Sequence, residues 1–137
     1  MEIEISLKAL IKDNHDRYLI IKRAHPYPKE EECRWDVPGG RLVPGEKIPE
    51  ALSREIKEET GMIMFNVPKI INAQDILRVT GKHTIRLAFL TEAKGQIILD
   101  SNEHSEYQWM SLDEALKTHH DLYLTPVLEE LKKGKTE

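Results

Sequence analysis

Alternating apolar and polar side chains predict a half-buried strand near the start of the chain. Between residues 2 and 12 every second position is apolar, at Ile3, Ile5, Leu7 and Ala9. A period of two places these side chains on one face of a strand and the intervening polar ones on the other. A turn at Asp13-Asn14 and the apolar run 18–21 follow, so we expect a second strand that forms a hairpin with the first.

The most regular helix of the chain is expected over residues 49–60. Pro49 suits the first position of a helix, because its missing N–H is not needed there. Gly61 suits the residue after the last turn, where a left-handed backbone is common. Apolar side chains recur at helical spacing, at Ile48, Leu52 and Ile56. One face of this helix is therefore expected to pack on a core.

The remaining pattern predicts further strands and two helices near the C-terminus. Apolar runs at 69–71 and 86–90 are typical of strands, and 97–99 is a third candidate. Ser111 and Glu114 have the spacing of a capping box, which opens a helix. Thr125-Pro126 begins a last amphipathic helix. This order of elements predicts an α/β (α+β) fold, a sandwich with a mixed sheet in a single domain.

Composition agrees with one globular domain and narrows its partners. The chain has 137 residues, of which 39% are hydrophobic and 32% charged, and its net charge is −4. This acidic balance disfavours binding to a nucleic-acid duplex. No apolar run reaches the roughly 20 residues that span a membrane. The single Cys33 suits a reducing compartment, and the alternating N-terminus is unlike a targeting peptide, so we expect a cytoplasmic protein.

Three carboxylates on the predicted helix are the first candidates for chemistry. Glu55, Glu58 and Glu59 fall within an arc of about 100° that overlaps the apolar stripe. A run of glutamates is usually a solvated face, but here the far side of the helix already holds other polar residues. Carboxylates gathered at the edge of a core repel one another, and a divalent cation relieves that repulsion. Oxygen ligands favour Mg²⁺ or Mn²⁺ over zinc, and Mg²⁺ favours a phosphate-bearing ligand.

Residues beside these carboxylates fit the same interpretation. Arg54 flanks the acidic arc, and its guanidinium can hold a carboxylate by two parallel hydrogen bonds, although an ordinary surface arginine has the same spacing. Gly39 and Gly40 follow a proline and would allow a metal or phosphate to approach the backbone closely. A plain turn would also explain two glycines after a proline.

Nine positions between 40 and 62 together match one motif without departure. They are Gly40, Glu46, Arg54, Glu55, Ile56, Glu58, Glu59, Gly61 and Met62. Their spacing is that of the Nudix box, and the flanking segments WDVPGG and YQWMS are similar to those of the same family. The chain therefore resembles a Nudix (MutT-like) hydrolase. The resemblance is tight over residues 35–62 and looser over the rest of the chain.

The resemblance implies a fold and a reaction. The fold would be an α/β/α sandwich around a mixed sheet, with residues 1–137 forming a single Nudix hydrolase domain. The reaction would be hydrolysis of the diphosphate linkage of a nucleoside diphosphate joined to another group. The substrate classes are nucleoside triphosphates, ADP-ribose, sugar nucleotides and dinucleoside polyphosphates. The partner would be this small molecule, and the chain a monomer or a homodimer.

The resemblance also implies roles for individual residues. Glu55, Glu58 and Glu59 would bind the metal together with the backbone carbonyl of Gly39. Arg54 would orient Glu55 or a nearby carboxylate, and Glu46 would be a structural acid. Glu103, six residues before Trp109, occupies a position like that of a later acid that some relatives use as the general base. It is therefore a candidate for the general base and for a metal ligand, and Glu106 is the second choice. The alternative is that Glu103 is an ordinary solvated acid in a loop. The expected substrate-binding residues are Arg23, Gly40 and Arg86, with His83 as a weaker candidate.

Two other functions fit the same fold. One is a nucleotide sensor without catalysis, although such proteins usually lose acids of the box and this chain keeps all of them. The other is an isomerase of prenyl diphosphates. Leu124 stands near the place where relatives that hydrolyse oxidised guanine nucleotides carry an asparagine, which argues against that specificity. The sequence does not determine the preferred nucleobase, the number of metal ions or the phosphorus that is attacked.

Overall fold

The computed structural model describes residues 1–136 and contains two main sheets. The larger sheet has the order β4-β1-β7-β6 and is mixed, because β1 (Glu2–Ile11) runs parallel to β7 (Lys82–Thr91) and antiparallel to β4 (Gly39–Arg41). β6 (Lys69–Ile76) forms its antiparallel edge. The smaller sheet has the order β3-β2-β9, with bounds Trp35–Asp36, Tyr18–Arg23 and His104–Met110. β5 (Ile63–Met64) and β8 (Ala93–Lys94) form a short pair.

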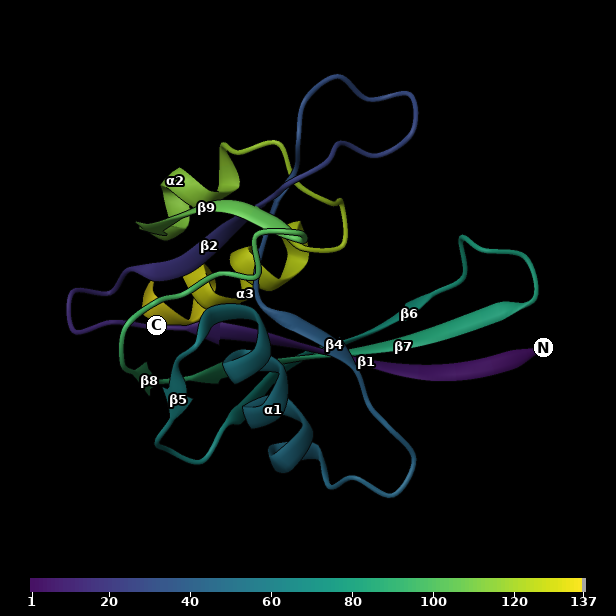
Figure 1. Ribbon diagram of the computed structural model, residues 1–137, viewed down its shortest axis with the longest axis horizontal. Helices are drawn as coiled ribbons and strands as arrows, with labels where there is room; N and C mark the ends of the chain where they lie inside the picture. The colour runs from purple at the N-terminus through teal and green to yellow at the C-terminus, as the bar shows by residue number, and fades with distance from the viewer. Residues whose placement is uncertain (137) are drawn as a thin grey trace.

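Helices cover the larger sheet on both sides, as Figure 1 shows. α1 (Ile48–Thr60) lies on one side, and α2 (Leu112–Leu116) and α3 (Thr125–Thr136) lie on the other with the smaller sheet. Side chains on the two faces of β1 pack into two different hydrophobic cores. Leu7 and Ala9 pack in one core with α1, and Leu10 packs in the other with Leu128 of α3. The predicted α/β/α sandwich around a mixed sheet is confirmed.

The helix ends follow from local chemistry that the sequence displays. Pro49 lies in the first turn of α1, and Gly61 ends the helix with φ 75°. The N–H of Gly61 donates to the carbonyl of Lys57 at 2.9 Å. At α2, the Ser111 hydroxyl accepts from the N–H of Glu114 at 3.1 Å, and the Glu114 carboxylate accepts from the N–H of Ser111 at 3.0 Å. The predicted capping box is therefore present.

The expected hairpin of the first two strands is wrong. β1 and β2 share an isolated bridge between Lys12 and Tyr18, and each then pairs within a different sheet. β7 pairs along the whole of one edge of β1 and β4 pairs with the other edge at residues 6–8, whereas β2 pairs with β3 and β9. The turn was read correctly, but the alternating pattern does not say which edge of a strand is free.

Two further differences concern the segment after β8. Residues 97–99 form no strand; Ile97 and Leu99 pack against the core beside α1, while the N–H of Ile98 donates to the carbonyl of Thr60 at 2.8 Å. β9 was not predicted as a strand, because its middle residues are polar and exposed. Among the described residues, no helix is long and apolar enough to cross a membrane.

Candidate active site

The central helix and a short strand bring two carboxylates onto a pair of glycines. β4 holds Gly39 and Gly40 beside β1, and α1 packs next to them. The N–H of Gly39 donates to Oε2 of Glu59 at 2.9 Å. A Cβ on Gly40 would lie 2.3–2.5 Å from the carboxyl atoms of Glu55, so only glycine leaves room for that side chain. Glu55 and Glu59 therefore meet the backbone where the box begins.

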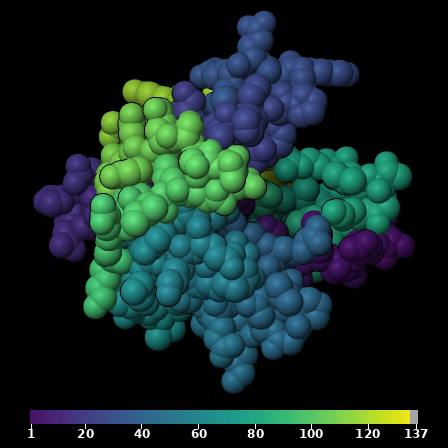
Figure 2. All heavy atoms as spheres, in the orientation of Figure 1, coloured from purple at the N-terminus to yellow at the C-terminus, as the bar shows by residue number. Residues whose placement is uncertain are grey.

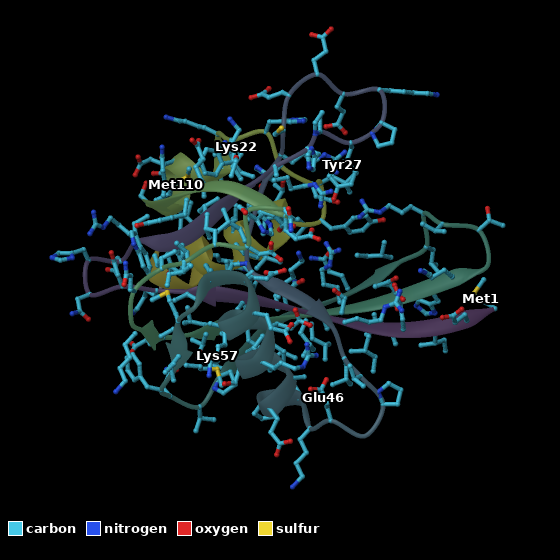
Figure 3. All side chains as sticks on the ribbon, in the orientation of Figure 1. Met1, Lys22, Tyr27, Glu46, Lys57 and Met110 are labelled. Carbon is cyan, nitrogen blue, oxygen red and sulfur yellow. The ribbon has the colours of Figure 1, made fainter. Side chains whose placement is uncertain are left out.

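Arg54 connects the acids of the helix to the loop before it. Its Nε and Nη2 donate to the two oxygens of Glu46 at 2.7 and 2.9 Å, and its Nη1 donates to Oε1 of Glu55 at 2.8 Å and to Oε2 of Glu58 at 3.2 Å. The bond to Arg54 and the N–H of Val43 lower the pKa of Glu46, which keeps this carboxylate charged. Figure 3 labels Glu46 at the start of α1. Four residues thus form one charged clamp that fixes Glu55.

Glu59 lies in a less polar place than its neighbours. Burial, assisted by the charges of Glu55 and Asp36, raises the pKa of its carboxyl to about 7, although the Gly39 N–H and Lys8 oppose the shift. A carboxyl in this state binds a proton or a cation more readily than a solvated one. Glu59 is therefore the acid of the cluster with the greatest need of positive charge.

Lys8 and Asp36 join the two sheets at this point, and the sequence did not single them out. Nζ of Lys8 donates to Oδ2 of Asp36 at 2.9 Å, and both side chains are largely shielded from solvent. Asp36 was visible only as a letter of the WDVPGG segment. Lys8 was assigned to the solvated face of its strand, but that face turns toward the smaller sheet.

Arg23 and Glu103 lie together at the end of the smaller sheet. The N–H of Ala24 donates to the carbonyl of Glu103 at 2.8 Å, and Arg23 is opposite His104 in the pairing of β2 and β9. The guanidinium of Arg23 stacks on the Tyr27 ring at 4.3 Å, and its Nε is buried without a hydrogen-bond partner. Figure 3 labels Tyr27 in the loop above β4.

His104 is a further residue that the sequence did not predict. Its side chain is almost fully buried, and Nδ1 has no hydrogen-bond partner. Burial lowers its pKa, so the ring is neutral at pH 7, while the charges of Asp36, Lys8 and Arg23 also act on it. Lys8 and Asp36 also act on the carboxyl of Glu59, so His104 lies near the same region. A histidine within a charged loop sequence gives no signal of burial.

The two candidates on β7 lie apart from the box. Arg86 is opposite Ser6 of β1, two residues along that strand from the level of Gly39. His83 lies near the other end of β7, and its Nε2 is 2.7 Å from Oδ1 of Asp75 on β6. The contact with Asp75 therefore links His83 of β7 to β6, whereas Arg86 lines a pocket between β1 and the β6–β7 hairpin.

The donor atoms suit a hard divalent cation. Carboxylate oxygens of Glu55 and Glu59 lie beside the backbone of Gly39 and Gly40, and oxygen ligands are those that Mg²⁺ and Mn²⁺ prefer. Within residues 1–136, no three His, Cys, Asp or Glu side chains already converge as a complete ligand set. The reason is visible at Glu58, whose side chain is 59% exposed and turned to Arg54. Its participation requires a change of side-chain rotamer.

Comparison with known proteins agrees with the fold and the motif. The family model described as NUDIX domain matches residues 4–131. The 8-oxo-dGDP phosphatase NUDT18 of Mus musculus is 31% identical over 125 residues, which cover 85% of this chain and 36% of the relative. The nucleoside triphosphatase NudI of Escherichia coli (strain K12 / DH10B) is 29% identical over 121 residues, covering 80% of this chain and 82% of the relative. This chain therefore spans about a third of the length of NUDT18.

A solved structure extends the agreement to three dimensions. The crystal structure of the MutT protein from Methanosarcina mazei Go1 has a TM-score of 0.80 and 30% sequence identity, covering 98% of this chain and 96% of that one. The family match covers nearly all of the described residues, and the complete box lies inside it. The chain belongs to the NUDIX family, as its box predicted.

Proposed function

We propose that this chain is a metal-dependent hydrolase of the diphosphate linkage in nucleoside diphosphate compounds. The observation that carries the proposal is the meeting of Glu55 and Glu59 with the Gly39-Gly40 backbone under the Arg54 clamp. A bound cation stabilises partly desolvated carboxylates that lie together beside open backbone, because it offsets their mutual repulsion. A diphosphate is the ligand that best completes such a cation's coordination.

Glu55, Glu58, Glu59 and the carbonyl of Gly39 would hold Mg²⁺ or Mn²⁺. When bound, the metal neutralises charge on the phosphates and lowers the pKa of water for in-line attack on phosphorus. Arg54 keeps Glu55 in one orientation through its bond at 2.8 Å. Because these side chains are already in position before substrate binds, less entropy is lost in aligning the reacting groups.

The smaller sheet supplies the other groups of the proposed mechanism. Arg23 has a buried Nε without a partner, which a phosphate oxygen would satisfy. Glu103 is proposed as the base that accepts the proton from the attacking water. The segment that carries it is anchored to β2 through the bond from Ala24, so its carboxylate belongs to the same end of the sheet as Arg23.

The substrate class follows from the chemistry and from the relatives together. NUDT18 is named for 8-oxo-dGDP and NudI for nucleoside triphosphates, and both names describe a nucleoside with a phosphoanhydride. We propose a compound of that kind for this chain. Leu124 is buried and apolar, so it offers no side-chain hydrogen bond to an oxidised guanine.

A hydrolysis screen with Mg²⁺, in which the products are separated by chromatography, tests the proposal. It should include nucleoside triphosphates, 8-oxo-dGDP, ADP-ribose, sugar nucleotides, dinucleoside polyphosphates and a prenyl diphosphate. The Glu58→Gln variant should lower turnover at least ~10²-fold with an unchanged fold, because it removes a proposed metal ligand. Full activity of this variant would refute the role of Glu58. Tight nucleotide binding without turnover of any compound would favour the sensor, and conversion of a prenyl diphosphate would favour the isomerase.

A further inference from the structure

A cationic pocket lies on the larger sheet beside the proposed active site. It has a volume of about 210 Å³ and lies between β1 and the β6–β7 hairpin. Its polar lining consists of Glu4, Ser6, Arg78, Lys82, Thr84 and Arg86. Figure 2 shows the two segments that bound this pocket, the purple start of β1 and the teal β6–β7 hairpin, side by side at one end of the molecule.

The positive charges around this pocket outnumber the carboxylates. Glu4 is shared by Arg41 at 2.8 Å and Lys82 at 3.5 Å. Asp121, buried next to the pocket, is likewise shared by Arg78 at 2.8 Å and Arg34 at 3.3 Å.

Arg86 forms none of these ion pairs, and it acts only from a longer distance on Asp121, whose pKa its charge helps to lower. Among the described residues, no carboxylate lies within ion-pair distance of it. Its Nε is buried and has no hydrogen-bond partner. A guanidinium cannot lose its proton at physiological pH, so burial of an unsatisfied N–H is a cost that an anionic ligand would remove.

The rest of the lining favours a small anion over a nucleobase. The apolar lining is Ile76 and Val79, and none of the described lining residues is aromatic. A base would therefore lack a ring on which to stack, whereas a phosphate or carboxylate fits the fork of a guanidinium.

The pocket lies within reach of the same substrate molecule. Gly39 is opposite Lys8 on β1, and Arg86 is opposite Ser6. Two residues along a strand correspond to about 7 Å, and the two strand spacings from β4 across β1 to β7 add about 10 Å sideways, so the two backbones are about 12 Å apart. A group bound at Arg86 can therefore belong to the molecule whose diphosphate lies beside Gly39.

We propose that Arg86 and its pocket bind a second anionic group, a phosphate or carboxylate, carried by the substrate at a distance from the diphosphate that is cleaved. This inference rests on the proposed function and narrows its substrate class. It selects diphosphates that have a charged group on either the nucleoside or the sugar.

Two pairs of substrates test where that charge is carried. ADP-ribose and its 2′-phosphate differ by a phosphate on the nucleoside, and UDP-glucose and UDP-glucuronate differ by a carboxylate on the sugar. In at least one pair, kcat/KM should be at least about tenfold higher for the more anionic member, the effect of about 1.4 kcal/mol. That ratio should fall toward 1 in Arg86→Gln and less far in Arg86→Lys, which keeps the charge. A ratio at or below 1 in both pairs would overturn the inference.

A matched control and a second variant keep the test sharp. Arg17→Gln removes an exposed arginine held by Asp13 in the turn before β2, and it should leave both ratios unchanged. If Arg86→Gln does not fold, Lys82→Gln at the rim of the pocket should lower the preferred ratio instead. A ratio that Lys82→Gln leaves intact would then count against the pocket.

A binding measurement separates this inference from the proposed hydrolysis. The Nε–H signal of Arg86, identified by its loss in Arg86→Lys, is followed by NMR while inorganic phosphate is added to the metal-free protein. If no diphosphate is hydrolysed, the proposed function fails, and a saturable shift of this signal still supports the pocket. In that case, an unmoved signal would overturn the pocket as well.

Discussion

Gly39 and Gly40 are adjacent residues, but they lack a side chain for different reasons. A Cβ on Gly39 would lie 2.0 Å from the backbone oxygen of Leu7, inside the pairing of β4 with β1. A Cβ on Gly40 would meet the end of the flexible Glu55 side chain. The first position is therefore required by the fold, and the second by the proposed site.

Alanine at each of these positions should separate stability from activity. Gly39→Ala should reduce the free energy of unfolding by about 3 kcal/mol, because backbone must move. Gly40→Ala should keep the fold but displace Glu55 and lower metal-dependent turnover at least about tenfold. Thermal melts and steady-state kinetics on both variants check this. Equal loss of stability in the two variants would show that the Glu55 side chain does not move aside to make room for the new methyl group.

Glu59 should make the metal-free protein less stable as the pH rises. Its folded-state pKa of about 7 lies above the ordinary value of 4.5, so the folded protein retains a proton that the unfolded chain has released. The free energy of unfolding therefore falls as the pH rises from about 4.5 to 7 and levels off above it, by at most about 3 kcal/mol for this group.

The variant Glu59→Gln removes this dependence and can still accept the bond from Gly39. Compared with the wild type in a chelator, it should gain stability progressively between pH 5 and 8, as urea titrations would measure. Glu129→Gln, on the exposed side of α3, should run parallel to the wild type. If the Glu59→Gln curve is also parallel, the carboxyl of Glu59 is not raised by burial.

At the scale of elements, α1 depends on the loop before it for the orientation of its acids. Glu46 lies in that loop, accepts two bonds from Arg54 and accepts another from the N–H of Val43 at 3.0 Å. Without this carboxylate, Arg54 would keep its bonds to Glu55 and Glu58 but lose its anchor on the loop.

Glu46→Gln should lower turnover about tenfold and leave the helix intact, because it weakens a charge-assisted bidentate pair. Glu50→Gln is the matched control, since Glu50 is an exposed acid in the first turn of the same helix. Circular dichroism and kinetics on the two variants test the clamp. Loss of activity in the Glu50 variant as well would mean that general charge near α1 is responsible.

The sequence predicted α1 and its acids well because their signals are local. Pro49 and Gly61 mark the ends of the helix, and the arginine and three catalytic-type acids of the box, residues 54, 55, 58 and 59, lie within it. The meeting of those acids with Gly39-Gly40 depends on β4 pairing with β1, about thirty residues earlier, and periodicity does not contain that information. For the same reason the sequence placed Lys8 on the polar face of its strand without its bond to Asp36.

At the scale of the molecule, three segments distant in sequence close over the space between the two sheets. Asp121 accepts bonds from Arg34 of the 24–34 loop, from Arg78 of the β6–β7 hairpin and from the N–H of Tyr123. Burial alone would raise the pKa of Asp121, but the Tyr123 N–H and Arg78 hold it below its usual range. One charged side chain therefore ties the loop and the hairpin to the segment that precedes α3.

Loss of this charge should loosen both segments at once. In Asp121→Asn, Arg34 and Arg78 lose the carboxylate that they share, so we expect faster backbone hydrogen exchange over 24–34 and over 77–82. Asp113→Asn, which breaks an exposed pair with Lys132, should leave exchange in both segments unchanged. Faster exchange in the 24–34 loop alone would contradict a joint role of Asp121. It would mean that Glu30 and His119 do not hold the loop without Asp121, whereas stacking on Tyr123 is enough to hold Arg78. A joint response would instead show that access to the space between the sheets is governed by one carboxylate rather than by each segment separately.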